Sequence, residues 1–329
     1  MKRTQTAIPE TLLVLLASAV TGCASAPTMP RVEEISADTP LAFGNAEVII
    51  DGERQKWGMG WSGESHFYLL ILPENDNRAI SYDLKNEGDF YWPLAAGRYE
   101  LLGYHWQKGT EQRRGEIRAE FVIPDTGEDV YLGSLKFLGS KYVIGTVLVD
   151  EYDDARARFD ARFATRPATA AKGLMTFVES PGTVSEVLPP CHESWQIECT
   201  DRYHGVSPVT PEVTTSGFTD VDSLLPAFSW KGSGRSDVTY DLIIYEAATY
   251  SISGVVDTHA PGRLAEYAEG LTATTWRPAE PLKPATKFYW SVRMRDGEKV
   301  SRWSTYSHFT FMLIASSSGF GQWFQFETP

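Results

Sequence analysis

The sequence predicts an all-β protein, with two β-sandwich domains in tandem and one short helix after the first of them. Short apolar runs of strand length, separated by turn residues, fill residues 41–150 and return after residue 216. A chain of 329 residues is long enough for about two domains. Hydrophobic residues make up 42% of the chain and charged residues 22%, which is typical of a folded protein. We therefore expect two sandwiches, each with a core of its own.

The N-terminal segment, residues 1–22, differs from the body of the chain. Lys2 and Arg3 precede an apolar run, Leu12–Val20, which is about half as long as a membrane-spanning helix needs to be. Such a segment is typical of a secretory signal peptide. The run ends in the letters VTGC, which resemble the bacterial lipobox, and the resemblance implies cleavage before Cys23 and lipid on its thiol. An ordinary secretory signal with an incidental cysteine is the alternative.

The lipobox resemblance also implies a location. Ala24 follows the cysteine, where an aspartate is the usual signal for retention at the inner membrane, so the resemblance implies the outer membrane. Two or three acyl chains, at about 0.8 kcal/mol per buried methylene, would hold the protein stably there. Residues 23–40 are small, polar and proline-bearing, so we expect a flexible tether before the first domain. The periplasmic and cell-surface faces both stay open.

The charge balance excludes one class of partner. The formal net charge is −13 at pH 7, because 43 acidic residues face 30 basic ones. An acidic protein does not bind nucleic acid or an anionic membrane through a basic surface. We expect no nucleic-acid partner, and membrane contact only through the N-terminal lipid.

The first domain, residues 41–165, contains seven runs of strand length. Each is rich in β-branched or aromatic residues, and turn-forming residues separate them. Seven strands at this spacing indicate a sandwich. The expected strands are Ala46–Asp51, His66–Leu72, Asp89–Leu94, Arg98–Trp106, Ile117–Ile123, Val130–Phe137 and Tyr142–Val149.

One hairpin in this domain carries a family resemblance. The letters FYWPLAAGRYEL at residues 90–101 resemble a hairpin of prealbumin-like modules, such as the carboxypeptidase regulatory domain. Phe90, Trp92 and Leu94 share one strand face, and Gly97 permits the tight turn into the next strand. The resemblance implies a prealbumin-like sandwich, and it implies more about fold than about function.

The sequence period changes after residue 150. Residues 152–163 are alanine-rich, with aromatic residues four apart and acids before bases, which predicts a short helix. Residues 166–215 mix Pro, Thr, Ser and Gly, so we expect an irregular linker. Cys191 and Cys199 lie in it, and an even pair in an oxidising compartment predicts a disulfide. A metal site with nearby histidines is the alternative, although the spacing is not that of a zinc site.

The second domain, residues 216–315, resembles bacterial fibronectin type III repeats. The resemblance rests on PAFSW at 226–230, YDLIIY at 240–245, LKPATKFYWSV at 282–292 and SRWS at 301–304. It implies a fibronectin type III-like sandwich. Alternation in the third of these segments places Phe288, Trp290 and Val292 on one strand face, which we expect to be the core face.

The C-terminal segment, residues 316–329, begins with serine and glycine and then turns aromatic. Phe320, Trp323, Phe324 and Phe326 would be costly to leave in water. We expect these rings to pack either on a domain of this chain or on a partner.

No pattern typical of an enzyme or a cofactor site occurs in the sequence. It has no nucleophile elbow, P-loop, zinc-protease or dinucleotide-binding motif, and its six histidines are scattered singly. The acidic cluster at residues 150–154 falls at an expected helix start, where acids meet the helix dipole, and calcium binding is the alternative. We therefore predict a non-catalytic protein without metal or cofactor. A hydrolase site built from residues distant in sequence is the less favoured alternative.

Four aromatic residues mark a candidate binding surface. Trp57 and Trp61 flank a glycine-rich stretch, where they either stack on sugar rings or pack against the domain edge. Tyr104 and Trp106, with Leu102, are expected opposite the core face of their strand, which the neighbouring domain or a partner must then cover. We expect a lipid-anchored binding or assembly module for an unknown envelope protein, with a glycan-binding lipoprotein as the alternative.

Overall fold

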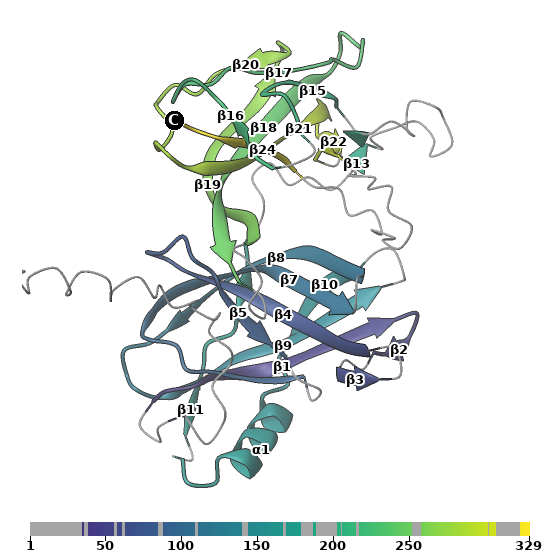
Figure 1. Ribbon diagram of the computed structural model, residues 1–329. Helices are drawn as coiled ribbons and strands as arrows, with labels where there is room; N and C mark the ends of the chain where they lie inside the picture. Colours follow the sequence, from purple (N-terminus) through teal and green to yellow (C-terminus); the bar gives the residue numbers. More distant parts are fainter. Residues whose placement is uncertain are drawn as a thin grey trace, which may run out of the picture.

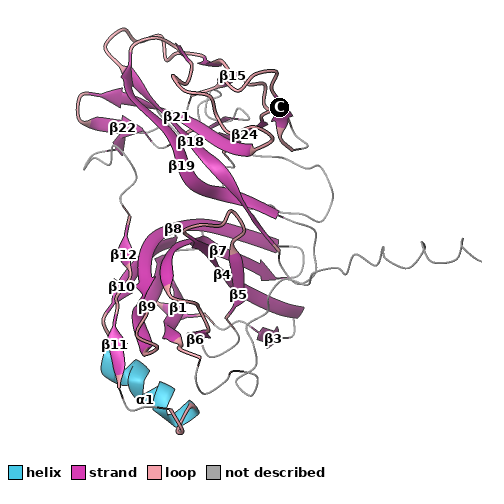
Figure 2. Cartoon of the chain, turned by 90° about the vertical axis from the view of Figure 1, so that its left-hand side faces the viewer, coloured by secondary structure: helices cyan, strands magenta, loops and turns pink. Residues whose placement is uncertain are grey.

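The structure is a computed structural model of the chain. It describes residues 35, 39–55, 58–60, 63–84, 88–108, 111–139, 144–166, 169–178, 187–188, 203–204, 206–214, 217–251, 258–301, 303–306 and 323–329. These residues form two β-sandwiches and one short helix, as the sequence predicts (Figures 1 and 2). In the described part of the chain, no helix is long and apolar enough to cross a membrane.

One sheet of the first domain contains a parallel pair. β1 and β9 run parallel at its centre, and β10 pairs antiparallel with the other side of β9. The order is β10-β9-β1-β2, while β6 also pairs with β1 and β11 with β9. The strands are β1 (Ala42–Ile50), β2 (Glu53–Arg54), β6 (Asp89–Trp92), β9 (Asp129–Gly139), β10 (Ile144–Val149) and β11 (Ala170–Lys172).

The second sheet of this domain is antiparallel along its path. Its order is β12-β8-β7-β4-β3, and β5 also pairs with β4. The strands are β3 (Gly58–Gly60), β4 (Gly63–Pro73), β5 (Ile80–Asp83), β7 (Gly97–Lys108), β8 (Glu111–Ile123) and β12 (Thr176–Phe177). Each of the seven strands that the sequence predicts is present, and β5 is the longest strand that it did not predict.

Residues 90–101 do not form the predicted hairpin, because β6 pairs with β1 in one sheet and β7 pairs with β4 and β8 in the other. The aromatic residues of this segment nevertheless lie at the centre of the first core. Phe90, Trp92 and Leu94 are buried together with Tyr99 and Leu101 between the two sheets, which confirms the predicted face. The rings of Phe90 and Trp92 stack with their centroids 3.9 Å apart. Alternation therefore predicted this part of the core correctly.

The predicted helix is confirmed as α1 (Tyr152–Arg162). Its first turn carries Asp153 and Asp154, and its last turn carries Arg162, so its charges suit the helix dipole. Phe159 is fully buried and its ring centroid lies 4.4 Å from that of Phe43 on β1. The helix thus covers the outer face of the first sheet.

Part of the expected linker belongs to the first sandwich. β11 pairs with β9 in one sheet, β12 pairs with β8 in the other, and Met175 between them is buried in the core. A strand of two or three residues is too short to show the two-residue alternation by which longer strands are recognised. Such strands form because they pair with the edge of an existing sheet. The irregular linker was therefore predicted to begin too early. It was also predicted to end too late, because Val206 and the strand at residues 208–210 belong to the second sandwich.

The second domain packs a three-stranded sheet against a larger one. The small sheet has the order β15-β17-β20, and the large one contains β13-β22-β21-β18-β19, with β24 and β16 attached. This arrangement is a fibronectin type III-like β-sandwich. A further pair joins β14 (Tyr203–His204) to β23 (Thr305–Tyr306). The strands are β13 (Val187–Leu188), β15 (Pro208–Thr210), β16 (Thr219–Asp220), β17 (Phe228–Trp230), β18 (Thr239–Tyr250), β19 (Thr258–Leu271), β20 (Thr275–Trp276), β21 (Lys287–Asp296), β22 (Lys299–Ser301) and β24 (Phe324–Glu327).

The predicted core face of β21 is confirmed. Phe288, Trp290 and Val292 are all fully buried in the core of the second domain. The C-terminal segment joins the same core, because β24 pairs with β21 and buries Phe324 and Phe326 there. These two aromatic residues therefore pack on their own chain.

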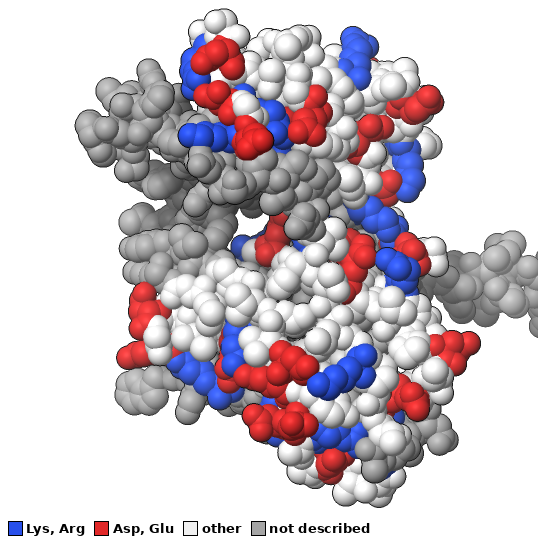
Figure 3. All heavy atoms as spheres, turned by 180° about the vertical axis from the view of Figure 1, so that it is seen from behind, with Lys and Arg blue, Asp and Glu red and all other residues white. Residues whose placement is uncertain are grey.

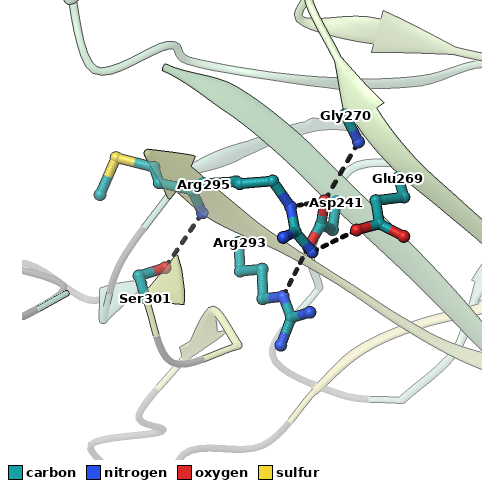
Figure 4. A network of polar contacts seen from close by, with 7 residues as sticks. Asp241, Glu269, Gly270, Arg293, Arg295 and Ser301 are labelled. Atoms are coloured by element: carbon teal, nitrogen blue, oxygen red, sulfur yellow. Dashed lines mark hydrogen bonds and ion pairs between the residues drawn. The ribbon is translucent and has the colours of Figure 1, made fainter. Parts of the chain in front are cut away.

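A buried charge network fixes the other face of this sheet (Figure 4). Asp241 on β18 accepts hydrogen bonds from Nε of Arg293 at 2.9 Å and from Nη2 of Arg295 at 2.7 Å. Nε of Arg295 and the backbone N–H of Gly270 also donate to Asp241, at 2.9 Å and 3.1 Å, and Arg295 bonds Glu269 at 2.7 Å. Because its members lie on β18, β19 and β21, the network ties three strands together.

Candidate functional site

The β18–β19 hairpin extends beyond its own sandwich and lies on the first domain (Figure 1). Its end packs Ala248, Tyr250 and Ala260 against the outer face of β4 and β7. Leu102 is one of the first-domain residues buried by this contact. The neighbouring domain therefore covers this face of β7, which was one of the two alternatives left open by the sequence.

Main-chain hydrogen bonds join the two domains at the same place. The N–H of Ala79 donates to the carbonyl of Thr249 at 2.8 Å, and the N–H of Thr249 donates to the carbonyl of Asn77 at 2.9 Å. The hydroxyl of Ser81 also donates to the carbonyl of Ser251. The hairpin thus adds to the β4–β5 end of the first domain as a short strand would, which fixes the register of the contact.

Two arginines cross the junction in opposite directions. Arg118 of the first domain donates to the carbonyls of Gly262 at 2.7 Å and Pro261 at 3.0 Å. Arg263 of the hairpin donates to the carbonyl of Pro73 at 2.6 Å and also to that of Asp76. Each domain therefore contributes a charged donor to the backbone of the other.

A β-bulge directs Arg118 toward the hairpin. Leu101 pairs with Ala119 and Gly103 with Glu116, so that Ile117 and Arg118 together oppose Leu102. Arg118 has a φ of 54°, which is unusual for a residue other than glycine. Bulges commonly redirect side chains in this way.

Neighbouring groups stabilise the positive charge of Arg118. Its guanidinium bonds Glu100 at 2.8 Å and lies 4.5 Å from the ring centroid of Tyr245. Burial by itself would lower the pKa of Arg118, but the carboxylates of Glu116 and Glu100 outweigh that effect and raise it. The junction therefore holds a permanent cation, in contact with residues of both domains.

The face expected for Tyr104 and Trp106 was wrong. Tyr104 is only 4% exposed and lies in the first core, against which Trp106 also packs. The strand pairing explains this, because Leu70 pairs with Gly103 and Ile71 with Leu101, so that Leu102 is an extra residue on β7. One extra residue reverses the alternation beyond it. Gly103 inside a strand was the available sign of a bulge.

A buried histidine at the junction was not among the sequence-predicted site residues. His105 faces the hairpin, with its Nδ1 at 3.3 Å from the hydroxyl of Tyr250. Burial, with a smaller effect from the charge of Arg114, lowers the pKa of His105 to about 3. Its imidazole is therefore neutral near pH 7, and its Nε2 has no hydrogen-bond partner among the described residues.

A groove of about 340 Å³ opens beside these contacts, walled by both domains. Arg98, Glu100 and Glu120 line it from the first domain, and Tyr245 and Leu264 from the second. Figure 3 shows acidic and basic side chains interspersed around the junction. Its walls offer polar and charged side chains, and Leu264 offers an apolar contact.

The remaining predicted site residues lie outside the described part of the chain. They are the lipidation site Cys23, the pair Cys191 and Cys199, and the surface residues Trp57 and Trp61. Within the described ranges, no three His, Cys, Asp or Glu side chains come together in a way that could hold a metal ion. The His66–Asp83 pair, 2.8 Å from Nδ1 to Oδ2, is a partly exposed contact between β4 and β5.

Comparison with known proteins gives only distant structural similarity. No protein-family model matches the chain, and no curated protein matches it. The FN1–FN3 domains of chicken CNTN1 align over 82% of this chain and 69% of their own, with 9% identity and a TM-score of 0.18. A DUF3823 family protein from Bacteroides ovatus aligns over 88% and 99%, with 10% identity and a TM-score of 0.19. Two fibronectin type III domains of chicken tenascin align over 74% and 84%, with 10% identity and a TM-score of 0.18.

Proposed function

We propose that this protein is a non-catalytic binding or assembly module of the cell envelope, anchored at the outer membrane by lipid on Cys23. Its binding site is the groove at the domain junction. The first sandwich is prealbumin-like in this proposal, and the second is of the fibronectin type III-like kind. Both are folds that carry sites on a rigid framework rather than a particular chemistry.

The observation that supports a binding site here is the two-way contact of Arg118 and Arg263 with the backbone of the opposite domain. A groove between two separately moving domains would change shape continually. Charge-assisted bonds in both directions, with the apolar contact of Tyr250 beneath them, hold the walls in one arrangement. A preformed groove loses less conformational entropy when it binds a partner.

In-cell photo-crosslinking tests the proposed site. A photoreactive residue placed at Leu264, which is exposed in the groove, should give discrete adducts in intact cells. The matched control is Val209, which is also exposed but lies on β15 of the second domain. Identical adducts from the two positions, or none from Leu264, would count against the groove. Analysis of the adduct distinguishes a protein from an envelope glycan.

The proposed anchor has a separate test. Cys23→Ser removes the thiol that accepts lipid, so incorporation of labelled palmitate should be lost, and the protein should leave the outer-membrane fraction. Labelled palmitate on the Cys23→Ser protein would contradict lipid attachment at this residue.

We also propose that Cys191 and Cys199 form a disulfide in the oxidising envelope. A thiol reagent applied to the denatured, unreduced protein should then label neither cysteine, and should label both after reduction. Labelling of both before reduction would reject the pairing.

A further inference from the structure

Among the described residues, the outer edge of β12 has no partner strand, and Val178, which follows β12, lines the groove. β12 pairs with β8 on one side, with Thr176 opposite Glu120 and Phe177 opposite Ala119. The N–H of Val178 donates to the carbonyl of Arg118, so in an antiparallel ladder the N–H and C=O of Phe177 point away from β8. No strand of the described residues pairs with this second edge. Its backbone groups are therefore placed to bond an added strand.

Apolar side chains lie exposed along the same edge. Phe177 and Val178 are each 39% exposed, and Leu264 across the groove is 46% exposed. Val178 shares the outer face of the sheet with Arg118, whereas Phe177 points to the flank of the sandwich, on the side of Ala119. An added strand would thus meet an apolar contact on each of its two faces.

The charge beside this edge is acidic. The side chains of Glu74, Glu116 and Glu120 are 56%, 43% and 50% exposed. Arg98 is similarly exposed, but it already bonds Glu120 at 3.0 Å and lies 3.7 Å from Glu74. Of the two arginines of the junction, Arg118 has a side chain only 8% exposed, and Arg263 is partly buried and donates to the carbonyls of Pro73 and Asp76. The charge that remains open to a partner therefore favours cations.

We infer that the occupant of the groove is an extended polypeptide of alternating apolar and basic residues, which adds as a strand to β12. This inference rests on the proposed binding function and names its partner class. The apolar side chains of the peptide contact Phe177 on the flank, and the basic ones reach Glu116 and Glu120. Their methylene stems lie along Val178 and Leu264. Main-chain bonds to Phe177 supply part of the affinity, as in other strand additions.

The test uses a fluorescein-labelled octapeptide of alternating valine and lysine, binding to the full chain measured by polarisation. Phe177→Pro removes the outward N–H and none of the bonds to β8, and proline is tolerated at such an edge position. Because a hydrogen bond contributes about 1 kcal/mol, this variant should bind the peptide at least about fivefold more weakly. Its melting temperature should stay that of the parent protein.

The charge component has a matched control. Glu116→Gln with Glu120→Gln should weaken binding and reduce its salt dependence. Glu280→Gln with Glu298→Gln, two exposed glutamates of the second domain, changes the net charge equally and should leave binding unchanged. A peptide of alternating valine and glutamate should not bind.

Three outcomes would overturn the inference: unchanged affinity in Phe177→Pro, equal losses in the two double variants, or equal binding of the acidic peptide. These outcomes are distinct from failure of the proposed function. Specific crosslinks from Leu264 that persist in Phe177→Pro would support a binding groove and reject strand addition. The absence of specific crosslinks from Leu264 in the protein without the Phe177→Pro substitution would reject the groove itself.

Discussion

The guanidinium of Arg118 in the first domain donates to the carbonyl of Gly262 in the second, 144 residues later in the chain, at 2.7 Å. Beside it, the guanidinium of Arg263 in the second domain donates to the carbonyl of Pro73 in the first. In both contacts the arginine donates to a main-chain carbonyl of the other domain. The junction therefore depends on backbone shape, which a bulge on β8 and an irregular β18–β19 pairing create.

Arg118→Ala should release the hairpin from the first domain. Each hydrogen bond to a charged group is worth about 1.5–3 kcal/mol, and the variant loses those to Gly262 and Pro261. We expect faster amide exchange at residues 258–264 and an increased radius of gyration in X-ray scattering. Arg98→Ala is the control, because its exposed ion pairs contribute less than about 1 kcal/mol. Exchange that is equally fast in both variants would show that Arg118 does not hold the junction.

Acid should weaken the junction through His105. Burial lowers its pKa in the folded protein to about 3, against about 6.5 in the unfolded chain, so the unfolded state binds the proton first. Stability is therefore lost as the pH falls from about 6.5 toward 3. At pH 5 the loss is about 2 kcal/mol, from about 1.5 pH units at about 1.4 kcal/mol each.

His105→Gln removes this dependence, because glutamine does not titrate. Urea unfolding of the two proteins between pH 7 and pH 5 should show a smaller decrease for the variant. An equal decrease in both would mean that His105 does not titrate as its burial requires.

Asp241 should make the second domain acid-sensitive at lower pH. Burial by itself would raise the pKa of Asp241, but hydrogen bonds from Arg295, the Gly270 N–H and Arg293 outweigh it and lower the pKa. The stability that this carboxylate contributes is thus present above its unfolded pKa of about 3.9, and is lost as the pH falls through the folded value. Asp241→Asn leaves two arginines without their carboxylate, and should cost about 3–5 kcal/mol at pH 7. The variant should lose less further stability than the parent protein in acid unfolding below pH 4.

Trp290→Ala should unfold the second domain selectively. A large buried aromatic residue typically costs about 3–5 kcal/mol when truncated, a large share of the stability of one domain. Urea unfolding followed by circular dichroism should separate into two transitions, with the first domain retained. Val209→Ala, at an exposed position of the same domain, should change little. An unchanged midpoint for Trp290→Ala would contradict the burial of this ring.

Strand alternation was sufficient wherever a strand keeps its register. Phe90, Trp92 and Leu94, and later Phe288, Trp290 and Val292, face their cores as the sequence predicts. Each of these segments has a strict period of two and no interruption, so one buried residue determines the face of the others. The short helix was also predicted correctly, because the spacing of its aromatic residues and the placement of acidic residues before basic ones both indicate a helix.

The candidate site could be recognised only from the packing of the two domains, because the residues that form it follow no sequence period. The extra residue at Leu102 reverses the faces of Tyr104 and Trp106, and the bulge of β8 directs Arg118 outward. Arg118 and Gly262 are brought together by the packing of two domains, which no local pattern reports. The two sandwiches and most of their core residues could be predicted from the sequence, because alternating burial is a local property of each strand. The junction, its groove and its buried histidine depend on contacts between strands more than a hundred residues apart.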